Sequence, residues 1–139
     1  MNILLFFTPK AEVVYLEYDC SVRQAIEKMR HHGYASLPVI DDEGIYKGVV
    51  TDGDLLRELY NDGEPELKRL EKTPLKTILH RDYHPINADV SIDEVLSRVY
   101  KQNFVPVTDD RGVFIGIIKR RDIIKYLAGV KVDIPEDKL

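Results

Sequence analysis

The 139-residue sequence predicts a mixed α/β (α+β) fold made of two copies of one β-α-β-β-α unit. The first observation behind this prediction is a repeat. Residues 37–44 and 48–56 recur as residues 105–112 and 116–124, at a constant offset of 68. The second observation is a pair of helix-start signals, at Ser21 and Ser91, each followed by an apolar stripe of helical spacing. Because a repeat of this length defines the architecture, both copies are expected to have the same order of elements.

The first copy is expected to open with a short strand over residues 13–16, where β-prone side chains cluster. Ser21 and Gln24 have the spacing of a capping box, and apolar residues follow at positions 22, 25, 26 and 29, on one side of a helix. Gly33 is expected to end this helix. A strand through residues 38–40, a turn at residues 41–44, a second strand to Val50 and a helix from about Thr51 complete the unit.

The second copy repeats this order, with Ser91 and Glu94 as its capping box and a last helix that ends near Leu127. Its upstream part aligns at an offset of 70, so this copy is two residues shorter before Pro106 and its site need not be equivalent to the first. We expect a first unit over residues 1–63, a linker over residues 64–75 with a short solvated helix, a second unit over residues 76–130 and a polar tail over residues 131–139.

Composition excludes several classes of function. A formal net charge of -4 gives no footprint for a polyanion, so we expect no nucleic-acid partner. The single cysteine excludes an intramolecular disulfide and a thiolate metal site, which suits the cytoplasm. The apolar run at residues 3–7 is too short for a signal peptide and is expected to pack onto the core. No stretch approaches the roughly 18 to 20 apolar residues that span a bilayer, so no membrane association is expected.

The repeated blocks resemble the cystathionine-β-synthase (CBS) domain family. The resemblance rests on the Pro-Val-x-Asp strand and turn at residues 38–41, the Gly-x-x-Thr-x-x-Asp block at residues 48–54, and the duplication of both. It covers nearly the whole chain and takes the tandem form called a Bateman module. It implies two units related by pseudo-two-fold symmetry, sheets packed face to face, and often a disc-shaped homodimer.

The same resemblance implies clefts between the units that bind adenosine-containing ligands. Most members of the family are attached to an enzyme, channel or transporter domain that they regulate. The chain is more similar to the stand-alone bacterial pairs, whose regulated protein partner is often unidentified.

Thr51 and Asp54 are the first candidate binding residues. A helix that starts here offers free N–H groups and the positive end of its dipole to a phosphate. The resemblance implies that Asp54 binds ribose hydroxyls and that Thr51 contacts ribose or phosphate. Thr-x-x-Asp is also close to a plain capping box, which exists without a ligand. The tandem context favours binding, and both interpretations stay open.

The second copy departs from the pattern, because Lys119 replaces the threonine while Asp122 keeps the implied ribose contact. A lysine cannot cap a helix through an oxygen, but it can pair with a phosphate. The basic run at residues 119–121 fits a solvated face equally well.

Apolar residues before each Pro-Val pair and near the first strand of each copy are candidates to line the base. They are Tyr34, Ala35, Leu37, Pro38, Pro85, Ile86, Phe104, Val105 and Pro106. Most of them suit a core equally well, and Tyr34 and Phe104 are the favoured pair.

The sequence predicts no catalytic residue, no metal site and no enzyme. His31 and His32 diverge on a helix, while His80 and His84 flank a loop and are interpreted as surface histidines. Cys20 precedes a helix, where a lowered thiol pKa is conceivable, but no histidine or asparagine spacing supports a nucleophile. A Gly-rich phosphate loop of Walker or dinucleotide type does not occur.

The leading functional hypothesis is a sensor that requires no cofactor. An adenosyl ligand, among AMP, ADP, ATP, S-adenosylmethionine and cyclic di-AMP, would bind an inter-unit cleft and change conformation or assembly. The alternative is a ligand-free dimerisation or interaction scaffold with vestigial clefts. The lost threonine and the two-residue deletion of the second copy favour that alternative.

Overall fold

The computed structural model describes residues 2–61, 63 and 65–129, so the expected tail at residues 131–139 lies outside the described part. The first unit contains α1 (Val22–His32), β3 (Ser36–Ile40), β4 (Tyr46–Thr51) and α2 (Asp52–Leu59). The short strand β2 (Leu16–Glu17) runs parallel to β3, and β3 runs antiparallel to β4. A short helix, α3 (Leu67–Leu70), and a 3-10 turn at Leu75–Ile78 connect this unit to the second.

The second unit contains α4 (Ile92–Val99), β5 (Phe104–Thr108), β6 (Phe114–Lys119) and α5 (Arg120–Leu127). The N-terminal segment joins this unit in space. It forms a 3-10 turn at Ile3–Phe6 and the strand β1 (Phe7–Pro9), which pairs antiparallel with β6. A further 3-10 turn at Lys10–Glu12 leads back to the first unit. The predicted mixed α/β class and the repeated order of elements are therefore confirmed.

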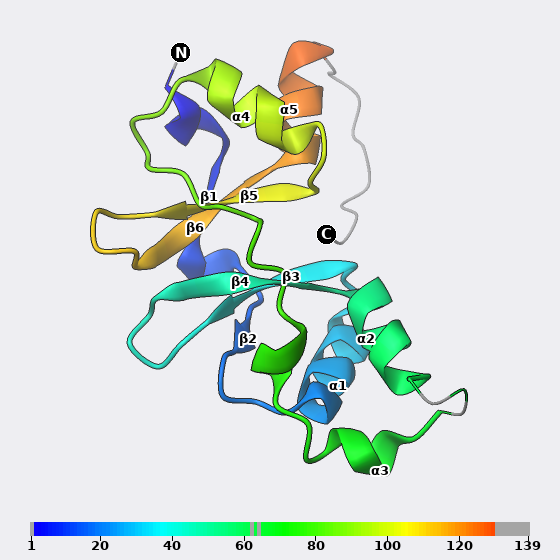
Figure 1. Ribbon diagram of the computed structural model, residues 1–139. Helices are drawn as coiled ribbons and strands as arrows, with labels where there is room; N and C mark the ends of the chain where they lie inside the picture. The colour runs from blue at the N-terminus through cyan, green and yellow to red at the C-terminus, as the bar shows by residue number, and fades with distance from the viewer. Residues whose placement is uncertain (1, 62, 64, 130–139) are drawn as a thin grey trace.

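The two three-stranded sheets, β2-β3-β4 and β1-β6-β5, pack face to face between outer helices (Figure 1). Alternation along the strands sorts the side chains by face. Leu37, Val39 and Val50 face α1 and its neighbours, and Val105, Val107 and Ile118 face the helices of the second unit. The intervening residues Ile40, Val49, Phe104 and Ile117 form the buried layer between the sheets.

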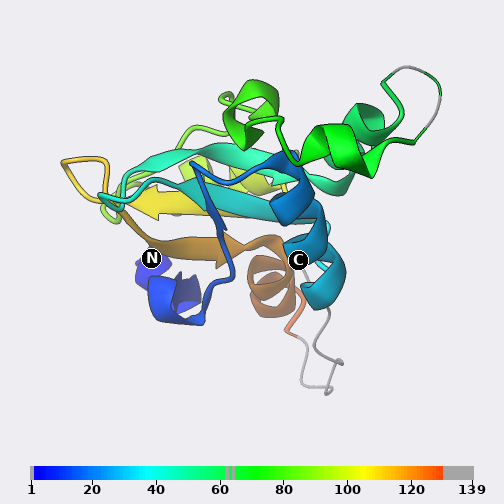
Figure 2. The same cartoon turned by 90° about the horizontal axis from the view of Figure 1, so that it is seen from below.

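The pseudo-two-fold axis passes between the two hairpin turns. Ile45 and Val113, which are equivalent in the repeat, form an isolated antiparallel bridge. The amide of Tyr46 donates to the carbonyl of Gly112 at 3.1 Å, and the amide of Phe114 donates to the carbonyl of Gly44 at 2.9 Å. Figure 2 shows both turns near one end of the molecule. The helices α2 and α5 start at the other end, where β4 and β6 finish.

Each sheet also pairs with a segment from the start of the other unit. His80, near the start of the second unit, pairs with Val49 of β4, and Thr8, near the start of the first, pairs with Ile117 of β6. Val49 and Ile117 are equivalent in the repeat, so Thr8 and His80 occupy equivalent places in space. Gly48 and Gly116 admit these crossing segments, because a Cβ at either position would collide with the carbonyl oxygen of His80 or of Thr8.

Several local predictions are confirmed. Ser21 and Gln24 form a reciprocal capping box, and Gly33 ends α1 with φ 71°. The apolar N-terminus packs onto the core through Ile3 and Phe6, within the cluster of the second unit.

Three local predictions need correction. The first strand is β2 at Leu16–Glu17 and not residues 13–16, because Val13 turns into the layer between the sheets. The linker helix is not simply solvated, since Leu70 is fully buried in the core of the first unit. Only half of the second capping box forms. The Ser91 hydroxyl accepts from the Glu94 amide, but the Glu94 carboxylate pairs with Arg98.

We expect Gly48→Ala to reduce the free energy of unfolding by roughly 1–3 kcal/mol more than Gly112→Ala, which is the overpacking cost of a buried collision. Both glycines have positive φ, at 149° and 82°, but a Cβ at Gly48 would lie 2.6 Å from the carbonyl oxygen of His80, whereas the nearest atom at Gly112 is 3.9 Å away. Urea unfolding of the two variants measures the difference. Equal losses would show that the crossing segment is not held tightly against β4.

Candidate functional site

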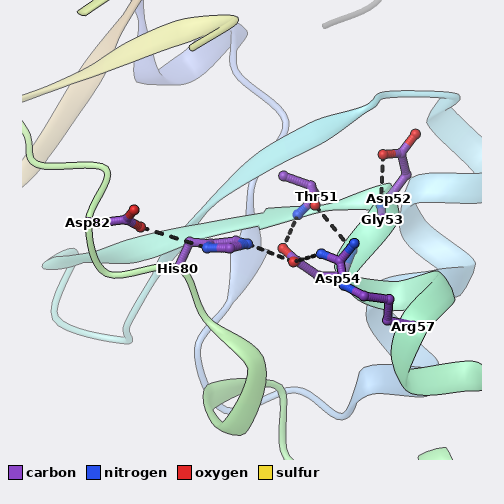
Figure 3. Close-up of polar contacts among 7 residues, drawn as sticks. All are labelled: Thr51, Asp52, Gly53, Asp54, Arg57, His80 and Asp82. Carbon is purple, nitrogen blue, oxygen red and sulfur yellow. Dashed lines mark hydrogen bonds and ion pairs between the residues drawn. The ribbon is translucent and has the colours of Figure 1, made fainter. Parts of the chain in front are cut away.

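The candidate site of the first unit begins where β4 passes into α2. Thr51 is the N-cap of α2, and its hydroxyl accepts a hydrogen bond from the Asp54 amide at 3.1 Å. The Asp54 carboxylate accepts from the Thr51 amide at 2.8 Å. Figure 3 shows that this reciprocal capping box fixes the carboxylate beside the first turn of the helix. The capping interpretation of Thr-x-x-Asp is therefore confirmed, and it leaves a binding role open.

Asp54 is also the centre of an ion-pair cluster. Its side chain is 7% exposed, and Oδ1 accepts from Arg57 Nη2 at 2.7 Å and lies 2.6 Å from His80 Nε2 (Figure 3). Burial raises the pKa of Asp54, but the hydrogen bonds from Thr51 and the contact with His80 outweigh it, so the pKa lies below its ordinary value. The carboxylate is therefore ionised and already has three donors.

His80 is a surface histidine as the sequence interpretation expected, with a side chain that is 41% exposed, but the interpretation missed its contact with Asp54. The segment that carries it crosses onto β4, where the His80 amide donates to the Val49 carbonyl at 2.9 Å and its carbonyl accepts from the Val49 amide at 3.0 Å. The sequence gives no local signal for this contact, because His80 and Asp54 are 26 residues apart. The repeat indicates the contact only indirectly, because a segment of one unit reaches the sheet of the other only when the two units pack together.

Ser36 is a second residue that the sequence interpretation missed. It lies directly opposite Thr51 in the β3–β4 pair, so both side chains are on the face that looks toward the second unit. Ser36 is 3% exposed, and among the described residues its hydroxyl finds no hydrogen-bond partner. A buried hydroxyl without a partner costs roughly 1–3 kcal/mol. The signal in the sequence is a serine at the head of the apolar run Ser36–Ile40.

The equivalent place in the second unit is built differently. Lys119 is the N-cap of α5 without a side-chain cap, and the Asp122 carboxylate is partly exposed with no hydrogen bond or ion pair in the described part of the chain. Arg120 is committed elsewhere, because its Nε donates to the carbonyls of Val99 at 2.7 Å and Gln102 at 3.0 Å. The basic run is therefore not a plain solvated face, since Arg120 ties α5 to the end of α4.

The structure divides the residues predicted to line the base. Leu37 faces the outer helices of the first unit. Val105 and Ile86 pack together in the helix-facing core of the second unit, so these three belong to the helix-facing cores. Pro38, Phe104 and Pro106 are on the inter-unit face but fully buried, with Phe104 inside the inter-sheet cluster. Tyr34 lines a groove between α1 and α2 and stacks on His32, with ring centroids 5.8 Å apart. Ala35 is partly exposed, and Pro85 is exposed.

Cys20 has the opposite character from the one conceived from sequence. Burial, with a smaller effect of Glu17, raises the pKa of its thiol to about 11, so the thiol is neutral and a poor nucleophile. Within residues 2–61, 63 and 65–129, His, Cys, Asp and Glu side chains form no group of three or more that suits a metal ion. No helix among the same residues has the length and apolar character to cross a membrane.

Two pseudo-symmetric β-α-β-β-α units packed sheet to sheet, each with an aspartate on the first turn of its last helix, form the architecture of a tandem-repeat module. The chain belongs to the CBS domain family. The family model matches it twice, over residues 7–61 and 75–129, and each match contains one β-α-β-β-α repeat.

Curated relatives share the module in different settings. A CBS domain-containing protein of Dictyostelium discoideum is 25% identical over 142 residues, which cover 97% of this chain and 98% of that protein. The A-adding tRNA nucleotidyltransferase of Aquifex aeolicus is 29% identical over 124 residues, which cover 86% of this chain but 13% of the enzyme. The chain therefore spans nearly all of one relative and about an eighth of the other.

Solved structures confirm the fold. A CBS domain protein from Streptococcus pneumoniae superimposes with a TM-score of 0.84 at 25% identity, covering 93% of this chain and 88% of that one. The CbpB protein of Listeria monocytogenes in complex with c-di-AMP gives 0.84 at 20% identity, covering 91% and 95%. CBSX2 in complex with AMP gives 0.74 at 25% identity, covering 94% and 98%.

We expect Asp54→Asn to lower the free energy of unfolding by about 1–3 kcal/mol at neutral pH, because charged hydrogen bonds within the cluster are weakened. Asp122→Asn is the matched control, and it should change stability by less than about 0.5 kcal/mol since no partner of Asp122 is found in the described residues. Urea unfolding of both variants measures the comparison. Similar losses would contradict a special role for the Asp54 cluster.

The same pair of variants has an expected pH dependence. Because the pKa of Asp54 is lower in the folded chain than in an unfolded one, its ionisation stabilises the fold above about pH 4. That contribution is lost as the pH falls through the folded-state pKa. The difference between the wild type and Asp54→Asn should therefore shrink in unfolding curves recorded at about pH 3. A difference that is constant with pH would contradict the lowered pKa.

Proposed function

We propose that the chain is a regulatory protein that binds an adenosyl ligand between its two units. The observation that carries this proposal is the group formed by Ser36, Thr51 and Asp54. A buried hydroxyl without a partner lies opposite Thr51, the N-cap of the helix that carries Asp54, on the face that looks toward the second unit. Ribose offers hydroxyl groups that donate to a carboxylate and accept from a serine, so this class of ligand suits the group.

The two sites would hold such a ligand in different ways. In the first unit, Asp54 would accept the ribose hydroxyls while Thr51 lies next to ribose or phosphate. In the second unit, Asp122 has no competing partner among the described residues, and the first turn of α5 has no side-chain cap. Lys119 and the positive end of the α5 dipole suit a phosphate through charge.

Family relatives support the ligand class. CBSX2 is in complex with AMP, and Listeria CbpB is in complex with c-di-AMP. Among the residues proposed for the base, Tyr34, Ala35 and Pro85 keep exposed surface and remain candidates. A signal would pass through α2 and α5, because both helices start at the proposed sites and continue to the outer surface. A ligand that prefers one arrangement of the units would shift the population toward it, without turnover.

We expect AMP, or another adenosyl ligand from the same class, to raise the melting temperature of the protein. A ligand that binds only the folded chain adds about 2.7 kcal/mol at about 100 times its Kd. Asp54→Ala and Asp122→Ala assign the effect to a site, because each should abolish the part contributed by its own unit. The measurement is a thermal-shift screen with AMP, ADP, ATP, S-adenosylmethionine and c-di-AMP. No shift with any of them would contradict the proposal and leave the scaffold alternative.

A second function, self-association, is favoured by the outer faces of the last helices. Leu56 of α2 is 58% exposed and Ile124 of α5 is 54% exposed, and the two are equivalent in the repeat. Leu127, which is equivalent to Leu59, is exposed as well. The Leu56 face borders the apolar groove between α1 and α2. A face repeated by a pseudo-two-fold axis suits a symmetric contact between two copies of the chain.

We expect the wild type to sediment as a dimer and the Leu56→Glu, Ile124→Glu double variant as a monomer, because a buried charge without a partner opposes the contact. Leu5→Glu is the control, since Leu5 is 71% exposed and belongs to the N-terminal 3-10 turn rather than to α2 or α5. Sedimentation velocity distinguishes the species. A monomeric wild type, or a control that dissociates equally, would contradict this surface as the interface.

A further inference from the structure

His80 contacts the Asp54 carboxylate, which the proposed first site needs to bind the ribose hydroxyls. Its Nε2 lies 2.6 Å from Asp54 Oδ1, and because a carboxylate oxygen only accepts, Nε2 carries a proton whether the ring is neutral or charged. Arg57 donates to the same oxygen at 2.7 Å, and the Thr51 amide donates to Oδ2 at 2.8 Å. Figure 3 shows these donors converging on the carboxylate from the helix, the strand end and the crossing segment. Two ribose hydroxyls cannot join this set unless a donor leaves.

Of the three donors, His80 is the one whose side chain can gain a second N–H and a charge. Histidine is the side chain whose ordinary pKa lies between pH 5 and 8. Protonation of Nδ1 adds a full positive charge to the contact with Asp54, and charged hydrogen bonds are about twice as strong as neutral ones. The Thr51 amide does not titrate, and a guanidinium stays charged at every physiological pH.

The groups that face His80 come from three elements. Asp54 and Arg57 lie on α2, and Asp82 follows His80 in the crossing segment, with its Oδ1 3.7 Å from His80 Nδ1. Tyr83 lies beside the ring, with centroids 6.2 Å apart, and its carbonyl accepts from Tyr46 of β4. Burial raises the pKa of Tyr83, as do Asp82 and Asp54, while Arg120 lowers it. Burial raises the pKa of Tyr46 as well, so both tyrosines are neutral.

The second unit lacks this contact, although the fold provides an equivalent place for it. Thr8 pairs with Ile117 as His80 pairs with Val49, and both crossing carbonyls lie against an equivalent glycine, Gly116 or Gly48. Thr8 does not titrate, and no hydrogen bond joins it to Asp122 in the described residues. The difference between the two sites at this place is therefore a single side chain.

We propose that His80 is a gate on the first site, which holds Asp54 away from a ribose and holds it more firmly when protonated. This inference rests on the proposed function. Adenosyl ligands would bind the first unit more weakly at acidic pH, and the second unit would be insensitive to the gate. The two sites would then differ in pH response as well as in affinity.

The test measures AMP affinity by calorimetry at pH 6 and pH 8 in an Asp122→Ala background, so that only the first site reports. We expect affinity to fall roughly five- to tenfold from pH 8 to pH 6, which is the difference between a charged and a neutral hydrogen bond. His80→Thr, which introduces the residue found at the equivalent place, should bind more tightly and lose this dependence. His80→Gln keeps a donor that does not titrate, so its affinity should stay low and lose the same dependence.

His84→Thr is the matched control, because His84 is an exposed histidine in the same segment. Any effect of the titration of the AMP phosphate is the same for this variant, so its AMP affinity at both pH values should equal that of the parent. Tighter binding of the parent at pH 6, with weaker binding in His80→Thr, would make His80 a phosphate ligand and overturn the gate alone. No AMP binding in any variant or in the wild type would overturn the proposed function and the gate with it.

A readout without ligand tests the contact itself. Carbon-detected NMR follows the Asp54 carboxyl, whose pKa is held down partly by His80. The pKa of Asp54 should rise in His80→Thr and stay unchanged in His84→Thr. An unchanged titration in His80→Thr would show that His80 does not hold Asp54 in solution, and this result would overturn the gate whatever AMP does.

Discussion

The exchange of chain segments between the two units is the constraint on which the rest of this structure depends. A peptide from the start of each copy lies on the edge of the other sheet, and Gly48 and Gly116 give it the space to approach. An unpaired edge strand would expose a row of backbone donors and acceptors. Because each unit covers this edge for its neighbour, the inter-sheet layer and both helix starts are held in fixed register. The same exchange delivers His80 to Asp54, so the site chemistry is a product of the topology.

The fold was largely predictable because its signals are local and occur twice. Capping residues such as Ser21, the stop at Gly33 and the apolar strands each follow from short-range preferences, and the 68-residue offset supplies the duplication. Strand limits were less certain, since Val13 enters the inter-sheet layer instead of the ladder. The burial of Leu70 was missed because the three leucines of the linker, Leu67, Leu70 and Leu75, are too few among charged residues to define a periodic pattern.

The candidate site was predictable only in part. Thr51, Asp54, Lys119 and Asp122 lie at the two helix starts where the repeat places them. The contacts of these residues depend on long-range packing. The residues near Asp54 in sequence do not predict its contact with His80, and those near Ser36 do not predict that its hydroxyl is buried without a partner. The stacking residues were over-assigned because alternation places Leu37 and Val105 on the faces away from the other unit. A sequence shows the alternation but not which face is shared.

The chemistry of Cys20 has a practical consequence for following motions of the molecule. It is the single cysteine of the sequence, it packs against the core of the first unit, and its carbonyl accepts from the Leu75 amide. A half-buried thiol with a pKa of about 11 reacts slowly with alkylating reagents, which attack through the thiolate. Local opening of the first unit would expose it and restore ordinary reactivity. The rate of alkylation therefore reports the free energy of opening of the first unit, and it is not affected by opening of the second unit alone.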